Sequence, residues 1–96
     1  MTLMETKKRN ERFNAISERM SRRFSSENIK GRKFYKNGPT CYFRLDEFPG
    51  ENALVIEYAD NKNSAENNML EDGERFYCDK LSEEQMFNEM LKEIGN

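Results

Sequence analysis

Two short segments that alternate apolar and polar residues constrain the fold of this chain more than any other feature. Residues 41–48 have the sequence CYFRLDEF and residues 53–59 the sequence ALVIEYA, with Pro49 and Gly50 between them. A period of two residues is typical of strands that bury only one face. The residues expected on the buried face are Cys41, Phe43, Leu45, Leu54, Ile56 and Tyr58. The sequence therefore predicts an antiparallel hairpin over residues 40–60, at the centre of a sheet.

Amphipathic helices are predicted at both ends of the chain. Thr2 is followed three residues later by Glu5, a spacing that lets the two residues cap a helix reciprocally, and neither glycine nor proline follows before about residue 25. The same spacing recurs at Ser82, ahead of residues 83–94. The apolar stripes consist of Phe13, Ile16, Met20 and Phe24 in the first helix and Met86, Phe87, Met90, Leu91 and Ile94 in the last. Such stripes indicate helices that pack on the apolar face of a sheet.

Three further elements complete the predicted order. Residues 32–36 are expected to form an edge strand because most of their side chains are charged or polar. Residues 64–72 are expected to form a short helix, and residues 74–79 a fourth strand whose direction the sequence leaves open. The order α-β-β-β-α-β-α predicts one α+β domain over residues 1–96, with a four-stranded, mainly antiparallel sheet. Any fraying is expected within residues 1–10, where the apolar stripe fades.

The composition argues against an enzyme or a metalloprotein. Histidine is absent and there are only two cysteines, Cys41 and Cys78, so no metal site, cofactor or activated nucleophile is expected. Whether the two thiols lie close together is left open. The chain has no run of about 18 apolar residues and no apolar N-terminal region of the kind found in signal peptides. We therefore expect a cytoplasmic protein that does not bind membranes.

Charges of opposite sign are concentrated in different parts of the chain. Residues 1–36 contain eleven Lys and Arg and four Glu, a net charge of +7, whereas residues 37–96 contain five basic and fourteen acidic residues, a net charge of −9. Carboxylates beside exposed tyrosines are typical of a surface that attracts a basic protein. The residues predicted to bind such a partner are Glu57, Asp60, Glu66, Glu71, Asp72, Glu74 and Asp79, with Tyr58 and Tyr77. An acidic surface that serves only solubility is the alternative.

The basic N-terminal segment supports a different hypothesis. Arg12, Arg19, Arg22 and Arg23 could neutralise phosphates, so a regulator that binds nucleic acid is the second prediction. A homodimer that forms through the first helix is left open. If the first and last helices pack against each other, the opposite charges neutralise each other internally, and if they lie apart, both charges face a partner.

The C-terminal half of the chain combines four features in a fixed order. An aliphatic strand that ends in Glu57–Tyr58–Ala59 precedes a short helix closed by Glu71–Asp72–Gly73, an aromatic strand and an acidic amphipathic helix. In these features residues 53–94 resemble the C-terminal half of the small acidic immunity proteins that bacteria keep beside polymorphic or contact-dependent toxins. The resemblance implies a non-enzymatic cytosolic protein that inhibits a cognate toxin or nuclease domain by binding it. A phage-type inhibitor that mimics DNA and blocks a host defence nuclease is a further alternative.

Overall fold

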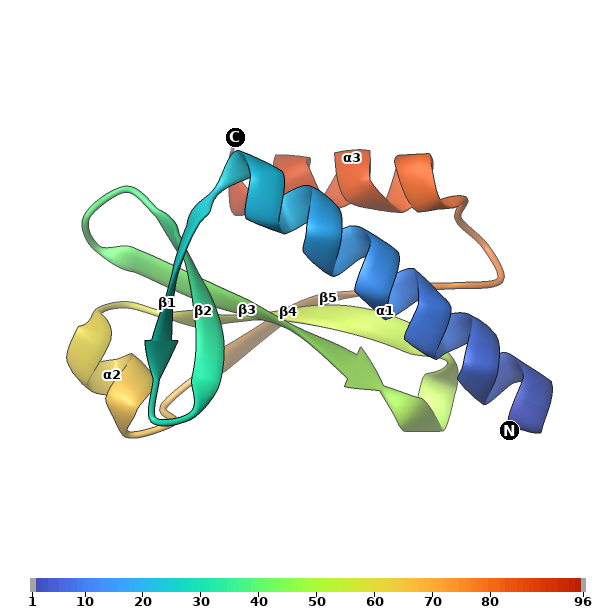
Figure 1. Ribbon diagram of the computed structural model, residues 1–96, viewed down its shortest axis with the longest axis horizontal. Coiled ribbons are helices and arrows are strands. Elements are labelled where there is room, and N and C mark those ends of the chain that lie inside the picture. The colour runs from blue at the N-terminus through green and yellow to red at the C-terminus, as the bar shows by residue number, and fades with distance from the viewer. Residues whose placement is uncertain (1, 96) are drawn as a thin grey trace.

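The computed structural model describes residues 2–95, which form one antiparallel sheet with helices on both faces. The elements in chain order are α1 (Leu3–Arg23), β1 (Ser25–Ile29), β2 (Arg32–Asn37), β3 (Cys41–Phe48), the 3-10 turn η1 (Pro49–Glu51), β4 (Ala53–Ala59), α2 (Lys62–Glu66), β5 (Glu71–Tyr77) and α3 (Glu83–Ile94). The five strands are neighbours in the order in which they occur in the chain. Helices α1 and α3 lie on one face of the sheet, and α2 lies at one end of the other face (Figure 1).

The predicted four-stranded sheet and the order α-β-β-β-α-β-α are wrong, because the sheet has five strands and the order is α-β-β-β-β-α-β-α. The strand that the prediction missed is β1, whose residues had been divided between the end of the first helix and a connection. Helix α1 ends at Arg23, and β1 begins two residues later. Lys30 and Gly31 then join β1 to β2 as a two-residue turn. Their φ angles are both positive, 54° for Lys30 and 80° for Gly31. A turn of this kind matches the twist of an antiparallel pair.

The additional strand changes the position of β2 in the sheet. Because β1 pairs with one side of β2 and β3 with the other, β2 is an internal strand and not the predicted edge strand. Tyr35, which was expected to be in contact with water, is only 2% exposed, and its hydroxyl group donates a 3.1 Å hydrogen bond to the carbonyl oxygen of Ser17 in α1. Strand β2 therefore contributes to the core.

The last strand begins three residues earlier than predicted and runs antiparallel to β4. Helix α2 is correspondingly short, with Asn61 as its N-cap and Ala65 as its buried residue. A bulge interrupts the pairing of β4 with β5 between Val55 and Glu57, where Gly73 and Glu74 lie opposite the single residue Ile56. No crossover is needed, because α2 and the residues after it simply reverse the direction of the chain.

The predicted hairpin is confirmed. Strands β3 and β4 pair in one register over residues 42–48 and 53–59, with Phe43 opposite Tyr58 and Leu45 opposite Ile56. Both predicted capping boxes are present, and both helical stripes face the sheet. The main core consists of Ile16, Met20, Phe24, Tyr35, Phe43, Leu45, Leu54, Ile56, Phe76, Met86, Met90 and Ile94. Burial of these side chains between the sheet and the two long helices is the main source of stability.

A second, smaller core lies on the opposite face of the sheet, beneath α2. It consists of Ile29, Phe34, Tyr42, Ala59 and Ala65, with Leu70 packed at its side. Tyr42 was expected to be exposed and is only 7% exposed, because α2 covers the part of the sheet on which it lies. Tyr42 is therefore a core residue.

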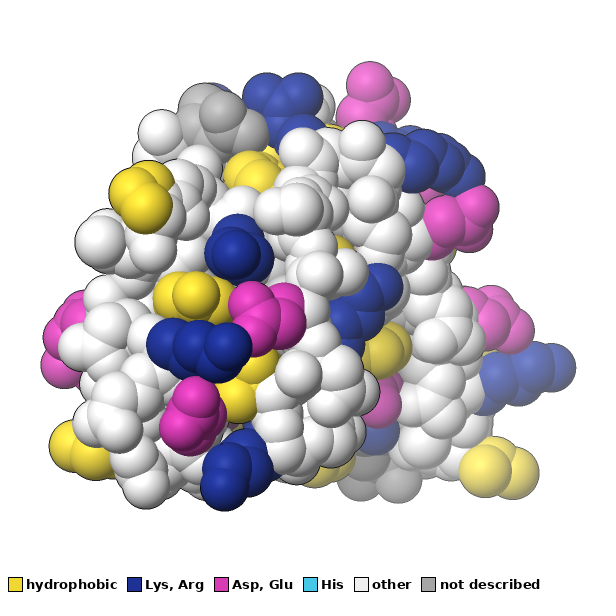
Figure 2. Space-filling view, turned by 60° about the vertical axis from the view of Figure 1, so that its left-hand side comes forward, with side chains coloured by type: hydrophobic (Ala, Val, Ile, Leu, Met, Phe, Trp, Pro, Cys, Tyr) yellow, Lys and Arg dark blue, Asp and Glu magenta, His cyan; other side chains and the backbone are white. Residues whose placement is uncertain are grey.

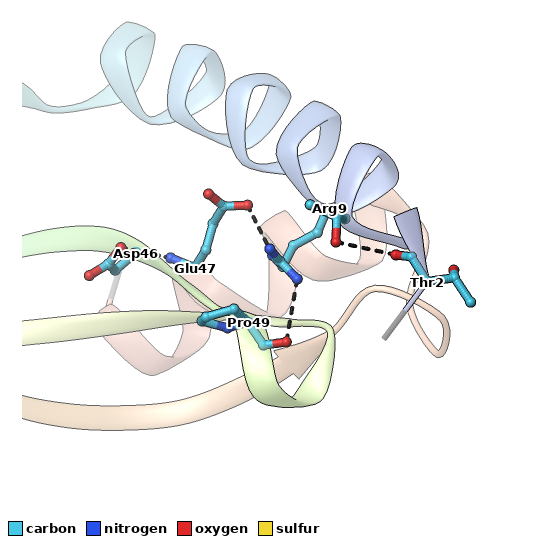
Figure 3. Close-up of polar contacts among 6 residues, drawn as sticks. Thr2, Arg9, Asp46, Glu47 and Pro49 are labelled. Carbon is cyan, nitrogen blue, oxygen red and sulfur yellow. Dashed lines mark hydrogen bonds and ion pairs between the residues drawn. The ribbon is translucent and has the colours of Figure 1, made fainter. Parts of the chain in front are cut away.

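Helix α1 uses several of its basic residues to contact the rest of the molecule. Arg9 is 6% exposed, and it donates a 3.0 Å hydrogen bond to the carboxylate of Glu47 and a 3.5 Å hydrogen bond to the carbonyl oxygen of Pro49 (Figure 3). Arg19 lies 2.7 Å from the carboxylate of Glu83 in α3. Because α1 packs beside α3, part of the opposite charge in the sequence is neutralised within the molecule.

Candidate protein-binding surface

Acidic residues differ in whether they have a basic partner within the molecule. Those that form ion pairs are Glu18, Glu27, Asp46, Glu47, Glu51, Glu57, Glu83 and Glu89. A group of five that form no ion pair with any described residue occupies the end of β4, helix α2 and the start of β5. We call this group the acidic end, and it comprises Asp60, Glu66, Glu71, Asp72 and Glu74. All five belong to the set predicted from the sequence.

A cavity of about 360 Å³ opens at the acidic end. Its walls are formed by the last residues of β4, helix α2 and the connection to β5, namely Tyr58, Asp60, Ser64, Asn68, Met69, Leu70 and Glu71. Three of the nine predicted partner-binding residues, Tyr58, Asp60 and Glu71, therefore line a single cavity. Met69 was not predicted as a surface residue, because it lies within the helix predicted over residues 64–72, whereas α2 ends at Glu66. Met69 is 65% exposed.

Tyr58 forms a wall of the cavity rather than a free anchor. Its hydroxyl group donates a 2.5 Å hydrogen bond to one carboxylate oxygen of Glu93 in α3, and the other oxygen accepts a 2.5 Å hydrogen bond from the backbone N–H of Glu74. Burial, and then the Glu93 carboxylate, raise the pKa of Tyr58 well above its ordinary value, so the phenol stays protonated. Tyr58 packs against the main core, as the alternation of the strand predicted, and is only partly exposed.

Glu57 lies apart from the cavity, on the face of the sheet that carries α2. Its carboxylate is 3.6 Å from Arg44, which is also 3.7 Å from Asp46. Burial raises the pKa of Glu57, and Arg44 partly opposes this effect. Glu57 is therefore a half-buried, paired group, while Asp72, its neighbour across the strands, remains exposed and has no ion pair with a described residue.

Two other predicted residues lie far from the acidic end. Tyr77 is the last residue of β5, and Asp79 comes two residues later. Both residues therefore lie at the end of β5 that is farthest from Glu71, about 20 Å away along the strand. The ammonium group of Lys80 lies 4.8 Å from the centre of the Tyr77 ring. The structure does not bring Tyr77 and Asp79 together with the cavity.

The arginines proposed to bind nucleic acid are mostly in contact with other groups. Arg12 donates a 2.8 Å hydrogen bond to the carbonyl oxygen of Leu81, and Arg19 pairs with Glu83. Arg22 pairs with Glu18. A shallow groove of about 340 Å³ remains among Arg19, Arg22, Arg23 and Phe87.

The charge separation in the sequence is not a separation in space. Figure 2, which looks toward the α2 end of the molecule, shows Lys and Arg side chains interspersed with Asp and Glu, and hydrophobic side chains between them. Lys62 of α2, for example, lies 2.9 Å from Glu27 of β1, which is also 3.7 Å from Lys36 of β2. The acidic surface is therefore smaller than the net charge of −9 suggested.

The described part of the chain contains no group of three or more His, Cys, Asp and Glu side chains placed to hold a metal ion. Cys41 and Cys78 are free, half-buried and at opposite ends of the β3–β4 hairpin, and burial raises the pKa of both thiols. Within residues 2–95, no helix combines the length and the apolar composition that crossing a membrane requires.

Comparison of the chain with protein-family models, with curated proteins and with solved structures finds no match.

Proposed function

We propose that this chain is a non-enzymatic binding protein that acts in the cytoplasm and occludes a basic partner domain with its acidic end. The class it fits best is that of immunity proteins and related toxin inhibitors, with a toxin or nuclease domain as the partner. One observation carries this proposal. Five carboxylates without an ion pair to a described residue occur together on the end of β4, helix α2 and the start of β5, and two of them, Asp60 and Glu71, line one cavity.

Unpaired carboxylates at one end of a small domain are suited to bind a basic protein. An exposed charge with no internal partner retains its full attraction for an incoming cation, which increases the rate of encounter and excludes acidic proteins. An acidic group that is already paired would first have to exchange its partner. The exposed Met69 adds an apolar contact within the same surface, and methionine is enriched at interfaces.

The two alternatives have less support. A nucleic-acid-binding regulator would need free arginines on α1, but Arg12 and Arg19 already bond to Leu81 and Glu83. A protein that mimics DNA would need a continuous row of carboxylates, whereas the α2 end carries basic side chains among the acidic ones (Figure 2).

Two charge-reversal variants test the proposal. In the first, the acidic-end residues Glu71, Asp72 and Glu74 are replaced by lysine. In the second, a matched control, the same change is made at Glu11, Glu84 and Glu89, which are exposed and lie outside the predicted partner-binding set. Both variants change the net charge by the same amount.

The experiment is cross-linking of each tagged variant in its native cells, followed by mass spectrometry and by purification of the proteins recovered. We expect a basic protein to be recovered with the natural chain and the control, but not with the acidic-end variant. When expressed alone, that protein should arrest growth, and co-expression of the natural chain should restore it. Equal recovery with both variants would exclude the acidic end as the binding surface.

A further inference from the structure

We propose that the cavity at the acidic end binds a single arginine side chain of the partner, an inference that rests on the proposed function and defines its central contact. The cavity has a volume of about 360 Å³, near the lower limit for ligand pockets. A pocket of this size suits one long side chain better than a folded segment.

The walls of the cavity match the two parts of an arginine side chain. Tyr58, Met69 and Leu70 supply aromatic and aliphatic surface that can cover the methylene groups. Asp60 and Glu71 supply carboxylates, and Ser64 supplies a hydroxyl oxygen as a further acceptor. The side-chain oxygen of Asn68 already accepts a 2.6 Å hydrogen bond from Arg32. This mixture of an apolar wall with a few polar groups is typical of a specific pocket rather than of a solvated acidic surface.

The charge state of these groups favours a cation. Asp60 and Glu71 form no ion pair with any described residue, and no basic residue is among those that line the cavity. Arg32 bonds to the lining residue Asn68 and not to either carboxylate. The third acidic group nearby, Glu93, is already bonded to the Tyr58 hydroxyl group and to the Glu74 N–H. Glu93 holds the wall in place, and the other two carboxylates are available to a ligand.

Arginine fits these groups better than lysine does. A guanidinium group has five N–H donors in a plane and can bond to two carboxylates at once, and it stacks on aromatic rings such as that of Tyr58. An ammonium group has three donors and is more strongly hydrated. Arginine is also the basic residue most enriched at interface centres.

The test is an NMR titration of the ¹⁵N-labelled full chain with the peptide acetyl-Gly-Arg-Gly-amide. The control peptide contains citrulline, which has the same shape as arginine but no charge. We expect saturable chemical-shift changes at the backbone amides of Ser64, Met69 and Glu71 with the arginine peptide, and binding about tenfold weaker or undetectable with citrulline. The lysine peptide should bind more weakly than the arginine peptide.

Two variants make the titration specific for the cavity. Asp60→Asn with Glu71→Gln should abolish the changes, and Glu11→Gln with Glu84→Gln should leave them intact. Equal binding of arginine and citrulline peptides, or retained binding in the first variant, would refute the arginine pocket. If the cross-linked partner still depends on Glu71, Asp72 and Glu74 in that case, the proposed function stands without the pocket. If the pocket binds arginine but no basic partner is recovered, the proposed function fails and the arginine pocket stands.

Discussion

The hydroxyl group of Tyr58 and the carboxylate of Glu93 form a 2.5 Å hydrogen bond that joins β4 to α3 beside the acidic end. The same carboxylate accepts a hydrogen bond from the backbone N–H of Glu74, at the bulge of β5. The carboxylate lies directly over Gly73, where a Cβ atom would be 2.5 Å from its nearer oxygen. Glycine at position 73 is therefore what allows Glu93 to reach the strand.

Replacement of Gly73 by alanine should displace the Glu93 carboxylate and break both of its hydrogen bonds. We expect Gly73→Ala to lower the free energy of unfolding by about 1–2 kcal/mol, because hydrogen bonds to charged groups contribute that much when they are partly exposed. Glu93→Ala should cost a similar amount. If the carboxylate is the cause, Gly73→Ala should cost little in the Glu93→Ala background, and urea unfolding of the four proteins measures this coupling. Additive effects would contradict it.

The ion pair between Arg9 and Glu47 should matter more than an exposed pair. Arg9 is 6% exposed, so Glu47→Ala withdraws a carboxylate from a nearly buried guanidinium group and should cost about 2–4 kcal/mol. Glu18→Ala removes the exposed pair with Arg22 and should change stability by about 0.5 kcal/mol or less. Thermal unfolding at neutral pH compares the two variants, and equal effects would show that the burial of Arg9 is energetically unimportant.

The burial of Glu57 should make the folded chain less stable as the pH rises through the pKa of this carboxyl group. Because burial raises the pKa of Glu57 in the folded chain, the folded state binds a proton here more tightly than the unfolded state. The charged form therefore costs stability at neutral pH, and this cost disappears as the pH falls through the folded-state pKa. We expect Glu57→Gln to be as stable as the natural chain or up to about 1 kcal/mol more stable at pH 7, with the difference shrinking in acid. The expectation would be contradicted if Glu57→Gln were less stable than the natural chain at pH 7 and if this loss of stability grew at higher pH.

The turn between β1 and β2 provides a test of the strand that the sequence did not predict. Lys30 has a φ angle of 54° and Gly31 one of 80°, and asparagine tolerates this conformation better than lysine does. Lys30→Asn should raise stability by about 0.5–1 kcal/mol, or roughly 3–6 °C in Tm. Gly31→Ala should lower stability by a similar amount, although a Cβ atom there would touch nothing within 4 Å. If neither substitution changes Tm, β1 and β2 do not pair as described.

The parts of the fold that local pattern determines could be predicted. The β3–β4 hairpin alternates with a period of two along both strands, and each long helix begins with a capping box whose two residues are three positions apart. Strand β1 could not be predicted in this way, because Ser25, Ser26 and Asn28 are weak strand formers and only Ile29 is buried. This segment is a strand because a two-residue turn lets it pair with β2, and such pairing is a tertiary effect.

The candidate site could be predicted only in part. The acidic end was in the predicted set because its carboxylates are dense in the sequence, but the sequence does not show which carboxylates are paired. Glu57 forms an ion pair with Arg44 across the hairpin, and Tyr58 bonds to Glu93, which is 35 residues further along the chain. Tyr42 becomes buried because α2 folds over it. These contacts depend on the tertiary arrangement, and they reduce a broad acidic segment to one cavity and its rim.

The most direct test of the central claim is calorimetric titration of the purified partner with the natural chain, the acidic-end variant and the matched control. We expect the natural chain and the control to bind alike, and affinity to fall as salt is increased, as it does for a contact between opposite charges. Reversal of Glu71, Asp72 and Glu74 should weaken binding by about tenfold or more while the far-UV spectrum stays unchanged. If the acidic-end variant binds as tightly as the control, the acidic end is not the binding surface.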